Sequence, residues 1–425
     1  MSLFDFCGLD FGTSNSTIGI FDGRQIKMVP LEQGKPTVRS AIFFDYDNHQ
    51  CIFGQQGISE YLALKPGRLM MSLKSILGSA LMQEKTFIDK QWVSYTDILA
   101  RLILHIKQIA ERHADQELTR VVLGRPVRFH DYDDKRDRLA ENTLAQVARQ
   151  VGFKTILFQF EPIAAALAYE QTIKQEQLAL IVDLGGGTAD FSVTRLRPAS
   201  THTKRTKNRE QDVLANKGVH VGGTDLDTCF SLEFVMPEMG LGGRMHGTTG
   251  RIEIPSSFYH DLTTWHTING LYTHATRRAL EEIYNHAVDP TPIRRLMSVI
   301  EKQQGHKILN EVEQAKCFLS SDDHTQLDFR FIEEKFLIGV TKVQFETVIE
   351  EKIEKLLQTL LMTVQEAGVK NNDIDSIFFT GGTSQIPIIR KRISDCFPRA
   401  TFVQGDVFSS VGKGLILDAQ QRFLD

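Results

Sequence analysis

The residues with the clearest chemical potential lie in the stretch LALIVDLGGGTADFSVTRL, Leu178–Leu196. A short apolar run there ends on Asp183, and three consecutive glycines, Thr188 and Asp190 follow. A glycine costs backbone entropy and supplies no side chain for packing, so three in a row indicate that something approaches this backbone closely. Consecutive glycines let backbone N–H groups point at one anion. The neighbouring carboxylates would repel that anion unless a hard cation such as Mg²⁺, with its waters, lies between them.

A second stretch near the N-terminus, GLDFGTSNSTIGI, repeats this pattern. It sets Asp10, Gly12 and Thr13 between two short apolar runs, in the same order of carboxylate, glycine and threonine. Two such turns facing each other across a cleft would hold a polyphosphate and its metal ion together, with the threonine hydroxyls on terminal phosphate oxygens. The alternative is two independent tight turns with capping aspartates, and the occurrence of the pair favours the nucleotide site.

The composition limits the class of protein. A chain of 425 residues with 41% hydrophobic and 24% charged residues is typical of a globular protein of two or more domains. A net charge of −4 gives no reason to expect nucleic acid or an anionic membrane as a partner. The five cysteines are scattered, without C-x-x-C or zinc spacing, which indicates a reducing compartment. We find no signal peptide and no membrane-spanning run, and therefore expect a cytoplasmic protein that binds neither nucleic acid nor membranes.

The elements that must position these turns follow from hydrophobic periodicity. Short apolar runs between turn residues predict strands over 3–45, 120–124, 155–159 and 376–380. Amphipathic patterns and a proline at a first helical turn predict helices over 96–113, 135–151, 344–367 and 387–397, from Pro162, and from about Val411. Two β-rich starts, each followed by helices, indicate an α/β architecture with two lobes. A polar, basic loop at 197–212 and a glycine-rich insertion at 237–257 interrupt this pattern.

Five motifs occur in the order found in the ATPase domain of the 70-kDa heat-shock chaperones. They are GLDFGTSNSTIGI, FEPIAAALAYE, IVDLGGGTADFSV, VGGTDLD and IFFTGGTSQIPIIRKRI. The chain resembles that family over nearly its whole length, and is most similar to the truncated DnaK-like proteins of the YegD type. The resemblance implies the actin, hexokinase and heat-shock ATPase fold. This is an α/β fold with two duplicated lobes, each a sheet flanked by helices, around a nucleotide cleft.

The resemblance also implies a division into domains. Lobe I would cover 1–178, with a peripheral subdomain at 39–117, and lobe II would cover 179–403, with a peripheral subdomain at 235–345. Residues 404–425 would form a helix that returns to lobe I. No peptide-binding domain is expected, so client binding in the usual way of the chaperones is not expected either.

Individual residues match the family's metal and catalytic positions. Asp10, Asp183 and Asp190 match the carboxylates that organise hydrated Mg²⁺. Lys74, in SLKSILG, matches a lysine that reaches the terminal phosphate and the attacking water, and Glu161 matches a glutamate that positions water or metal. The alternatives are a solvated helix lysine and an acidic helix start favoured by the helix dipole. The expected catalytic residues are Lys74, Glu161, Asp183 and Thr188.

The remaining matches concern the nucleotide itself, ATP or ADP. The expected contacts are Gly12, Thr13 and Ser14 in the first phosphate turn, Gly185, Gly186, Gly187 and Thr188 in the second, Gly222, Gly223 and Thr224 in a lobe-two turn, Glu313, Lys316 and Ser320 on a lobe-two helix, and Gly381, Gly382 and Thr383 beside the sugar and adenine. A plain hairpin turn is the alternative at Gly222. Cys317 and Gln385 stand where the family has arginines against the adenine. Since guanidinium stacking contributes about 0.5 to 2 kcal/mol per contact, we expect weaker binding than in the full chaperones.

Three functions are compatible with these residues. The first is a chaperone-type switch that binds Mg-ATP, hydrolyses it slowly to open and close its lobes, and acts, as a monomer, on an unidentified protein partner or cochaperone. The second is a small-molecule kinase of the same fold, against which Lys74 argues. The third is a non-catalytic nucleotide-binding interaction protein or an actin-like polymer. A Walker A motif is absent, and no dinucleotide-binding glycine pattern follows a strand.

Overall fold

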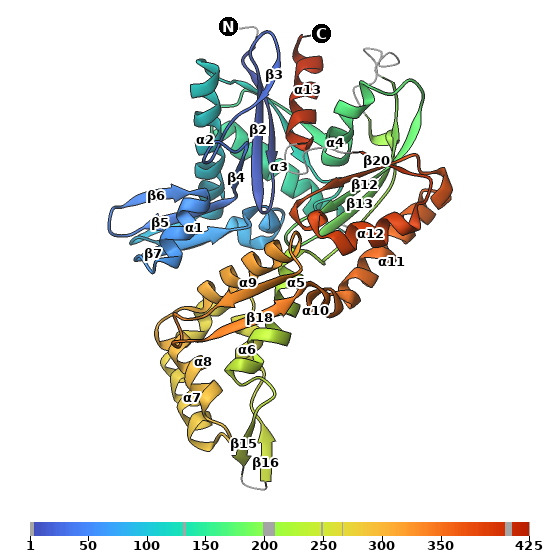
Figure 1. Ribbon diagram of the computed structural model, residues 1–425. Helices are drawn as coiled ribbons and strands as arrows, with labels where there is room; N and C mark the ends of the chain where they lie inside the picture. The colour runs from blue at the N-terminus through green and yellow to red at the C-terminus, as the bar shows by residue number, and fades with distance from the viewer. Residues whose placement is uncertain are drawn as a thin grey trace. The chain divides into compact units, whose positions relative to one another are not determined.

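The computed structural model describes residues 4–130, 133–198, 209–247, 250–265, 267–403 and 410–424. The chain forms two compact units (Figure 1). Unit 1 comprises Met1–His220, Leu356–Gln385 and Ile389–Asp425, and unit 2 comprises Val221–Lys355 and Ile386–Ile388. Most of the basic loop predicted at 197–212 lies outside the described residues.

Unit 1 contains two five-stranded paths of the same topology. The first runs β11-β10-β1-β2-β3, with β4 (Thr37–Arg39) added beside β2, and the second runs β14-β13-β12-β19-β20. The strands of the first are β1 (Phe6–Phe11), β2 (Asn15–Phe21), β3 (Ile26–Met28), β10 (Arg120–Arg125) and β11 (Thr155–Phe160). Those of the second are β12 (Gln177–Leu184), β13 (Ala189–Leu196), β14 (Val213–Val219), β19 (Ser376–Thr380) and β20 (Thr401–Val403).

The two sheets match strand by strand. In each sheet, three strands that follow one another in sequence pair antiparallel. The first of the three also pairs with a parallel strand on its other edge, and that strand pairs with a second parallel strand. The parallel strands need crossover connections, and helices supply these in both sheets. The weak sequence repeat between the two glycine turns therefore reflects a duplicated sheet, and the predicted α/β fold with duplicated lobes is confirmed.

Two long helices cover the outer side of the first sheet. They are α2 (Tyr95–Ala114) and α3 (Asp134–Gln150). Ser94 caps α2 by accepting from the backbone N–H of Asp97, and the apolar face predicted for 96–113 is buried in one core with the sheet. A smaller layer carries the remaining elements of this region, which are β5 (Ala41–Asp45), β6 (Gln50–Phe53), α1 (Gly54–Leu62), β7 (Gly67–Met71), β8 (Lys85–Ile88), β9 (Gln91–Ser94) and the 3-10 turns Leu73–Ile76 and Ala80–Gln83.

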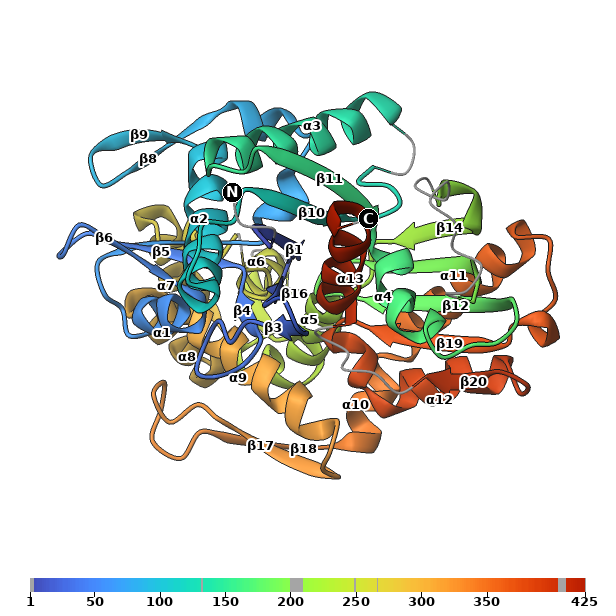
Figure 2. The ribbon, with the colours of Figure 1, turned by 90° about the horizontal axis from the view of Figure 1, so that it is seen from above.

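Two helices fill the space between the sheets of unit 1. They are α4 (Glu161–Glu170) and α13 (Ser410–Leu424), which pack against each other (Figure 2). Helix α13 also packs against β1, and α4 against β13. One hydrophobic core joins Phe6 and Val122 of the first sheet, Ile181 of the second, and Leu415 of α13. The helix α13 therefore contributes directly to holding the two sheets together.

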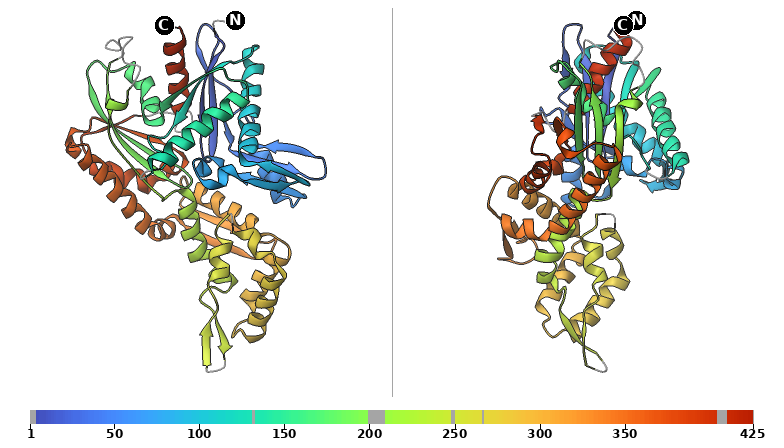
Figure 3. Two further views of the ribbon diagram at one scale, coloured as in Figure 1. Left: turned by 180° about the vertical axis from the view of Figure 1, so that it is seen from behind. Right: turned by 90° about the vertical axis from the view of Figure 1, so that its right-hand side faces the viewer.

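Unit 2 is mainly helical. Its elements are α5 (Gly223–Phe230), a π-turn at Ser231–Val235, 3-10 turns at Pro237–Met239 and Ile268–Leu271, β15 (Arg244–Gly247), β16 (Gly250–Glu253), α6 (Ser257–Leu262), α7 (His274–His286), α8 (Thr291–Glu301), α9 (Gly305–Leu319), β17 (His324–Asp328), β18 (Leu337–Thr341) and α10 (Lys342–Val348). Helix α7 packs on α8, and α9 packs on α5 and β17. The glycine-rich stretch 237–257 forms the β15–β16 hairpin, which projects from the helices of this unit (Figure 3).

One predicted helix is divided. The stretch expected to be a single helix over 344–367 forms α10 and α11 (Glu350–Glu366), with Ile349 between them at φ −90° and ψ 0°. Phe345, Ile349 and Ile353 are all buried at a spacing of four residues, so the apolar period continues through the interruption. The other late helix is α12 (Pro387–Cys396), close to its predicted bounds. Within the described ranges, no helix has both the length and the apolar character needed to cross a membrane.

Candidate functional site

The two glycine-containing turns lie at equivalent ends of the two sheets of unit 1. Gly12, Thr13 and Ser14 connect β1 to β2, and residues 185–188 connect β12 to β13. The second turn is closed by a hydrogen bond from the Gly185 N–H to the Thr188 carbonyl, at 2.9 Å. Both turns follow a strand that ends on or near a carboxylate, as the sequence predicts.

The two turns meet. A Cβ atom built on Gly186 would lie 2.5 Å from the Ser14 hydroxyl, closer than real Cβ atoms approach other atoms. Any side chain at residue 186 would therefore displace the Ser14 hydroxyl. By contrast, a Cβ on Gly187 would meet no atom within 4 Å, so the backbone of the second turn is open on that side.

The turn at Gly381–Thr383 joins the same site. The Thr383 hydroxyl donates to the Gly185 carbonyl at 2.8 Å, and a Cβ on Gly381 would lie 2.8 Å from Asp183 Oδ1. Since β12 and β19 are parallel neighbours, this turn and the second glycine turn leave the same end of the sheet. The residues predicted for the phosphates and those predicted for the sugar side are thus adjacent within unit 1.

Carboxylates gather at these turns. Asp183 and Asp190 are directly opposite each other across the antiparallel pair β12–β13. Burial and the charges of Glu161 and Asp183, opposed by Lys74, raise the pKa of Asp10 to about 7. Burial and the charge of Glu161 likewise raise the pKa of Asp183 to about 6, although Thr380 and Lys74 oppose the shift. The negative charge of these carboxylates therefore exceeds the positive charge that Lys74 supplies.

Lys74 and Glu161 form the main ion pair of the site. Lys74 Nζ lies 2.6 Å from Glu161 Oε1, and their side chains are only 10% and 12% exposed. Burial disfavours the charged lysine, but the charges of Glu161 and Asp10 outweigh it and raise the pKa of Lys74. Lys74 is therefore not a solvated helix lysine, since it lies in a short 3-10 turn and points at the carboxylates. Glu161 does begin α4, and it is also the partner of Lys74.

A small cavity opens beside the carboxylates. Its volume is about 20 Å³, and its lining includes Glu161, Asp183, Asp190, Thr380 and Asn216. A space of this size holds roughly one water molecule, and its polar lining provides hydrogen-bond partners for that water.

The residues predicted on lobe two form a separate cluster within unit 2. Gly222 precedes α5, and its N–H donates to Asp225 Oδ2 at 2.8 Å. This stretch therefore begins a helix, and the alternative interpretation as a plain hairpin turn is wrong. Lys316 of α9 donates to the Gly223 carbonyl at 3.1 Å and to Asp227 Oδ2 at 2.7 Å. The remaining predicted residues of this cluster are Thr224 beside Gly223 on α5, and Glu313 and Ser320, which flank Lys316 at the end of α9.

Sequence reasoning missed residues that support the turns. Ser40 donates its hydroxyl to the Gly12 carbonyl at 2.8 Å, and its N–H donates to the Ser14 carbonyl at 2.9 Å. A single serine before an apolar run carries no motif that would identify this role. Thr380 is different, because a polar residue at the carboxyl end of a buried strand, directly before two glycines, is a recognisable signal.

The residues present fit a hydrated magnesium ion. Carboxylate and hydroxyl oxygens are the donors that Mg²⁺ prefers, and the ion usually keeps several waters. Among the described residues, no three His, Cys, Asp or Glu side chains come close enough together to hold a metal ion directly. The excess of negative charge at Asp10 and Asp183 and the open backbone at Gly187 would suit a cation bound through water next to an anion.

Comparison with known families agrees with this geometry. The model of the family described as Hsp70 protein matches residues 6–240 and 281–414. The matched segments contain all the turns described above and the Lys74–Glu161 pair, and the β15–β16 hairpin lies between the two segments. Because the match covers most of the chain, the protein belongs to the Hsp70 family, at the level of a chaperone-type nucleotide-binding ATPase.

Proposed function

We propose that this protein binds Mg-ATP at the two glycine turns, hydrolyses it slowly, and uses the cycle as a conformational switch. The observation that carries the proposal is the contact between the turns at Gly186 and Ser14, with Lys74, Glu161 and the aspartates beside them. Members of the Hsp70 family bind ATP or ADP with Mg²⁺.

The phosphates would lie on the backbone of the turns. Backbone N–H groups of the two turns, other than that of Gly185, which bonds the Thr188 carbonyl, could donate to phosphate oxygens. The hydroxyls of Thr13 and Thr188 could donate to the terminal phosphate oxygens. When bound, Mg²⁺ would supply positive charge that stabilises the phosphates during phosphoryl transfer. Asp10, Asp183 and Asp190 would hold it through its waters.

The hydrolytic step needs a positioned water more than a strong base. Glu161 pairs with Lys74 and lines the one-water cavity. The water oxygen would form a bond to the terminal phosphorus while the bond from that phosphorus to the bridging oxygen of ADP breaks. The products are ADP and inorganic phosphate. Lys74 would stabilise the charge on the transferring group, and its pairing with Glu161 keeps it directed at the site.

Slow turnover suits a switch. If ATP and ADP favour different lobe positions, hydrolysis sets the time for which the protein stays in one of them. At the family level such a cycle controls interaction with a cochaperone or a substrate. We propose that this protein acts as a cytoplasmic monomer on a protein partner or cochaperone.

The test combines binding with turnover. Isothermal titration with Mg-ATP and Mg-ADP should give saturable binding, weaker than in full-length chaperones, and a phosphate-release time course should show slow turnover. Asp183→Asn should weaken binding of both nucleotides. Lys74→Ala should keep Mg-ADP binding and lose at least about tenfold in phosphate release, because it removes a charge that acts on the transferring phosphoryl group.

The same assays separate the alternatives. Phosphate transfer to a sugar or small acid, with little release to water, would favour the kinase. Unchanged phosphate release in Lys74→Ala would support the non-catalytic protein, and pelleting after addition of ATP would indicate the polymer. Absence of saturable binding by the wild type would refute the proposal.

A further inference from the structure

The catalytic lysine of the proposed site lies on a short segment. Lys74 belongs to a single 3-10 turn, Leu73–Ile76, preceded by Ser72 in the left-handed region at φ 57°. Within the turn, the Leu77 N–H donates to the Lys74 carbonyl at 3.2 Å, and the segment then reaches Gly78, which has φ 74°. One turn of 3-10 helix has few hydrogen bonds of its own. The position of this turn therefore depends on the burial of Leu73 and Leu77 in the core and on contacts from other segments.

Side chains from elsewhere in unit 1 hold the end of this turn. His130 Nε2 lies 2.8 Å from the Leu77 carbonyl, and Arg136 Nε donates to the Gly78 carbonyl at 3.3 Å. A carbonyl can only accept, so His130 Nε2 must carry the proton. The fit is close, since a Cβ on Gly78 would lie 2.7 Å from His130 Nε2.

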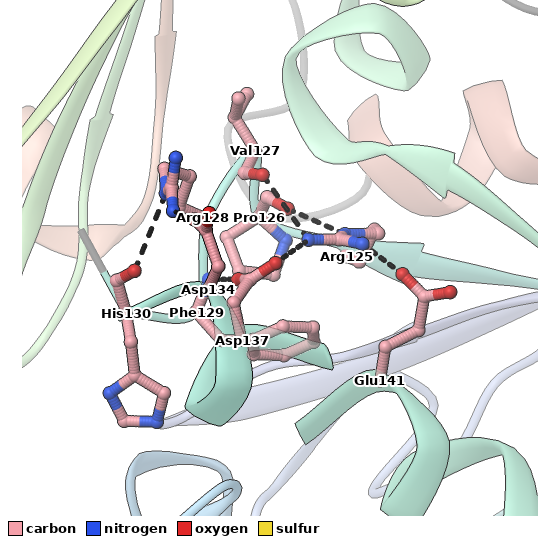
Figure 4. A network of polar contacts seen from close by, with 9 residues as sticks. All are labelled: Arg125, Pro126, Val127, Arg128, Phe129, His130, Asp134, Asp137 and Glu141. Carbon is pink, nitrogen blue, oxygen red and sulfur yellow. Dashed lines mark hydrogen bonds and ion pairs between the residues drawn. The ribbon is translucent and has the colours of Figure 1, made fainter. Parts of the chain in front are cut away.

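His130 is positioned in turn by Arg125. Arg125 donates from Nε to the Pro126 carbonyl at 3.0 Å and from Nη2 to the Val127 carbonyl at 3.2 Å, so it fixes the backbone of the stretch that leads to His130 (Figure 4). Its guanidinium also pairs with Asp137, at 3.0 Å, and with Glu141, both on α3. The fixed fork of five donors explains how one side chain reaches all these acceptors.

Arg125 also contacts the residue before Glu161. Its guanidinium carbon lies 5.4 Å from the ring centre of Phe160 and 5.2 Å from that of Phe129. One ring belongs to the loop of His130, and the other directly precedes Glu161. Pro126 and Val127, the residues whose carbonyls Arg125 holds, line the cavity together with Glu161.

We propose that Arg125 and His130 are positioning residues for the Lys74–Glu161 pair. Arg125 fixes Glu161 through Phe160 and fixes the stretch that leads to His130. His130 in turn fixes the turn of Lys74 through the Leu77 carbonyl. Neither side chain touches the nucleotide in this assignment. The catalytic consequence rests on the proposed function, whereas the positioning itself does not.

The positioning is tested by chemical labelling of Lys74. A lysine-acylating reagent and mass spectrometry report how often each ammonium group leaves its partner. Exposed Lys27 serves as the reactive reference, and Lys107, whose side chain is 5% exposed, reports global opening. In His130→Ala, labelling of Lys74 should rise several-fold while Lys107 stays protected. His130→Gln, whose side-chain amide can donate near the position of Nε2, should keep Lys74 protected.

Two further variants complete the test. Arg125→Lys keeps the charge but loses the fork, and should also raise labelling at Lys74. His113→Ala is the matched control, because His113 makes a similar ring-to-carbonyl contact, to Ile109 at 3.0 Å, within α2. It should leave Lys74 unchanged. If Lys74 stays as protected in His130→Ala and Arg125→Lys as in the wild type, the proposal is overturned. If His130→Ala also raises the labelling of Lys107, that variant has opened globally, and Arg125→Lys alone decides.

Turnover gives an independent measurement. Single-turnover phosphate release should fall about tenfold to a hundredfold in His130→Ala, with an unchanged Kd for Mg-ADP, and His130→Gln should recover most of the rate. A general structural defect would lower nucleotide affinity as well, which would count against positioning. If the wild type neither binds nor hydrolyses nucleotide, the proposed function fails, and labelling of Lys74 still decides whether His130 and Arg125 hold it.

Discussion

Asp183 and Asp190 are directly opposite each other on neighbouring antiparallel strands, at the open end of the second sheet. Like charges in this arrangement destabilise a sheet. Burial and the charge of Glu161 also make ionised Asp183 unfavourable in the ligand-free protein, and a bound cation would offset this cost. The same reasoning applies to Asp10, whose pKa is raised by burial and by the neighbouring carboxylates.

Replacing Asp183 should affect stability and binding in opposite directions. Asp183→Asn removes one charge from the cluster, so we expect the nucleotide-free protein to gain up to about 1 kcal/mol in free energy of unfolding, measured by urea titration at pH 8. The same variant should weaken binding of Mg-ATP. Asp45→Asn is the matched control. Asp45 accepts hydrogen bonds from the Asp47 N–H and the Asn48 amide, so its replacement should only destabilise. A loss of stability in both variants would contradict this interpretation.

The contact between the turns can be tested with one methyl group. Gly186→Ala should cost about 1–3 kcal/mol in free energy of unfolding, because its Cβ would overlap the Ser14 hydroxyl. Gly187→Ala should leave the free energy of unfolding nearly unchanged, since its Cβ meets no atom. In the double variant Gly186→Ala with Ser14→Ala, part of the stability should return, because the Ser14 Cβ lies 3.8 Å from the added methyl position. Equal stabilities of the two alanine variants would show that the turns do not meet.

The pH dependence of stability should contain a contribution from Asp5. Burial opposes ionisation of this carboxyl, but hydrogen bonds from Thr119 and Arg120 outweigh it and lower the pKa of Asp5. A carboxyl with a lowered pKa in the folded state stabilises the protein above its unfolded pKa of about 3.9, and this stability is lost as the pH falls through the folded pKa. Asp5→Asn should therefore destabilise at pH 7, and its difference from wild type should shrink below pH 4. A difference that stays constant with pH would exclude this role.

The predicted loss of adenine stacking can be reversed by substitution. Cys317 is exposed on α9, one residue after Lys316. Cys317→Arg should tighten ATP binding by about 0.5 to 2 kcal/mol in calorimetry, if the guanidinium stacks on the base as the family resemblance implies. Gln314→Arg adds the same charge one helical turn away and should give a smaller gain. Equal gains in both variants would indicate a general effect of charge.

Much of the site could be predicted because its chemistry is local in sequence. The carboxylate, glycine and threonine of each turn lie within a few residues of each other, and the strands around them follow clear apolar runs. The prediction that Asp10 and Asp183 share one site is consistent with the effect of the Asp183 charge on the pKa of Asp10. The individual roles of these residues in binding and catalysis stay predictions.

The supporting residues were not predictable in the same way. Ser40 and His130 act through backbone carbonyls of segments that are distant in sequence, and no local pattern records such a contact. The interruption at Ile349 was missed for another reason. The buried residues on both sides keep a helical period, so periodicity alone predicts a continuous helix.

The position of α13 has a consequence for how the chain folds. A Cβ on Gly8 of β1 would overlap the backbone at Ile416, so the first strand and this last helix pack at backbone distance. Contacts between such remote segments slow folding, because a long loop must close before they form. During synthesis, the first sheet would stay incompletely covered until residues 410–424 leave the ribosome. Its exposed apolar side chains would make the nascent protein itself a client for other chaperones.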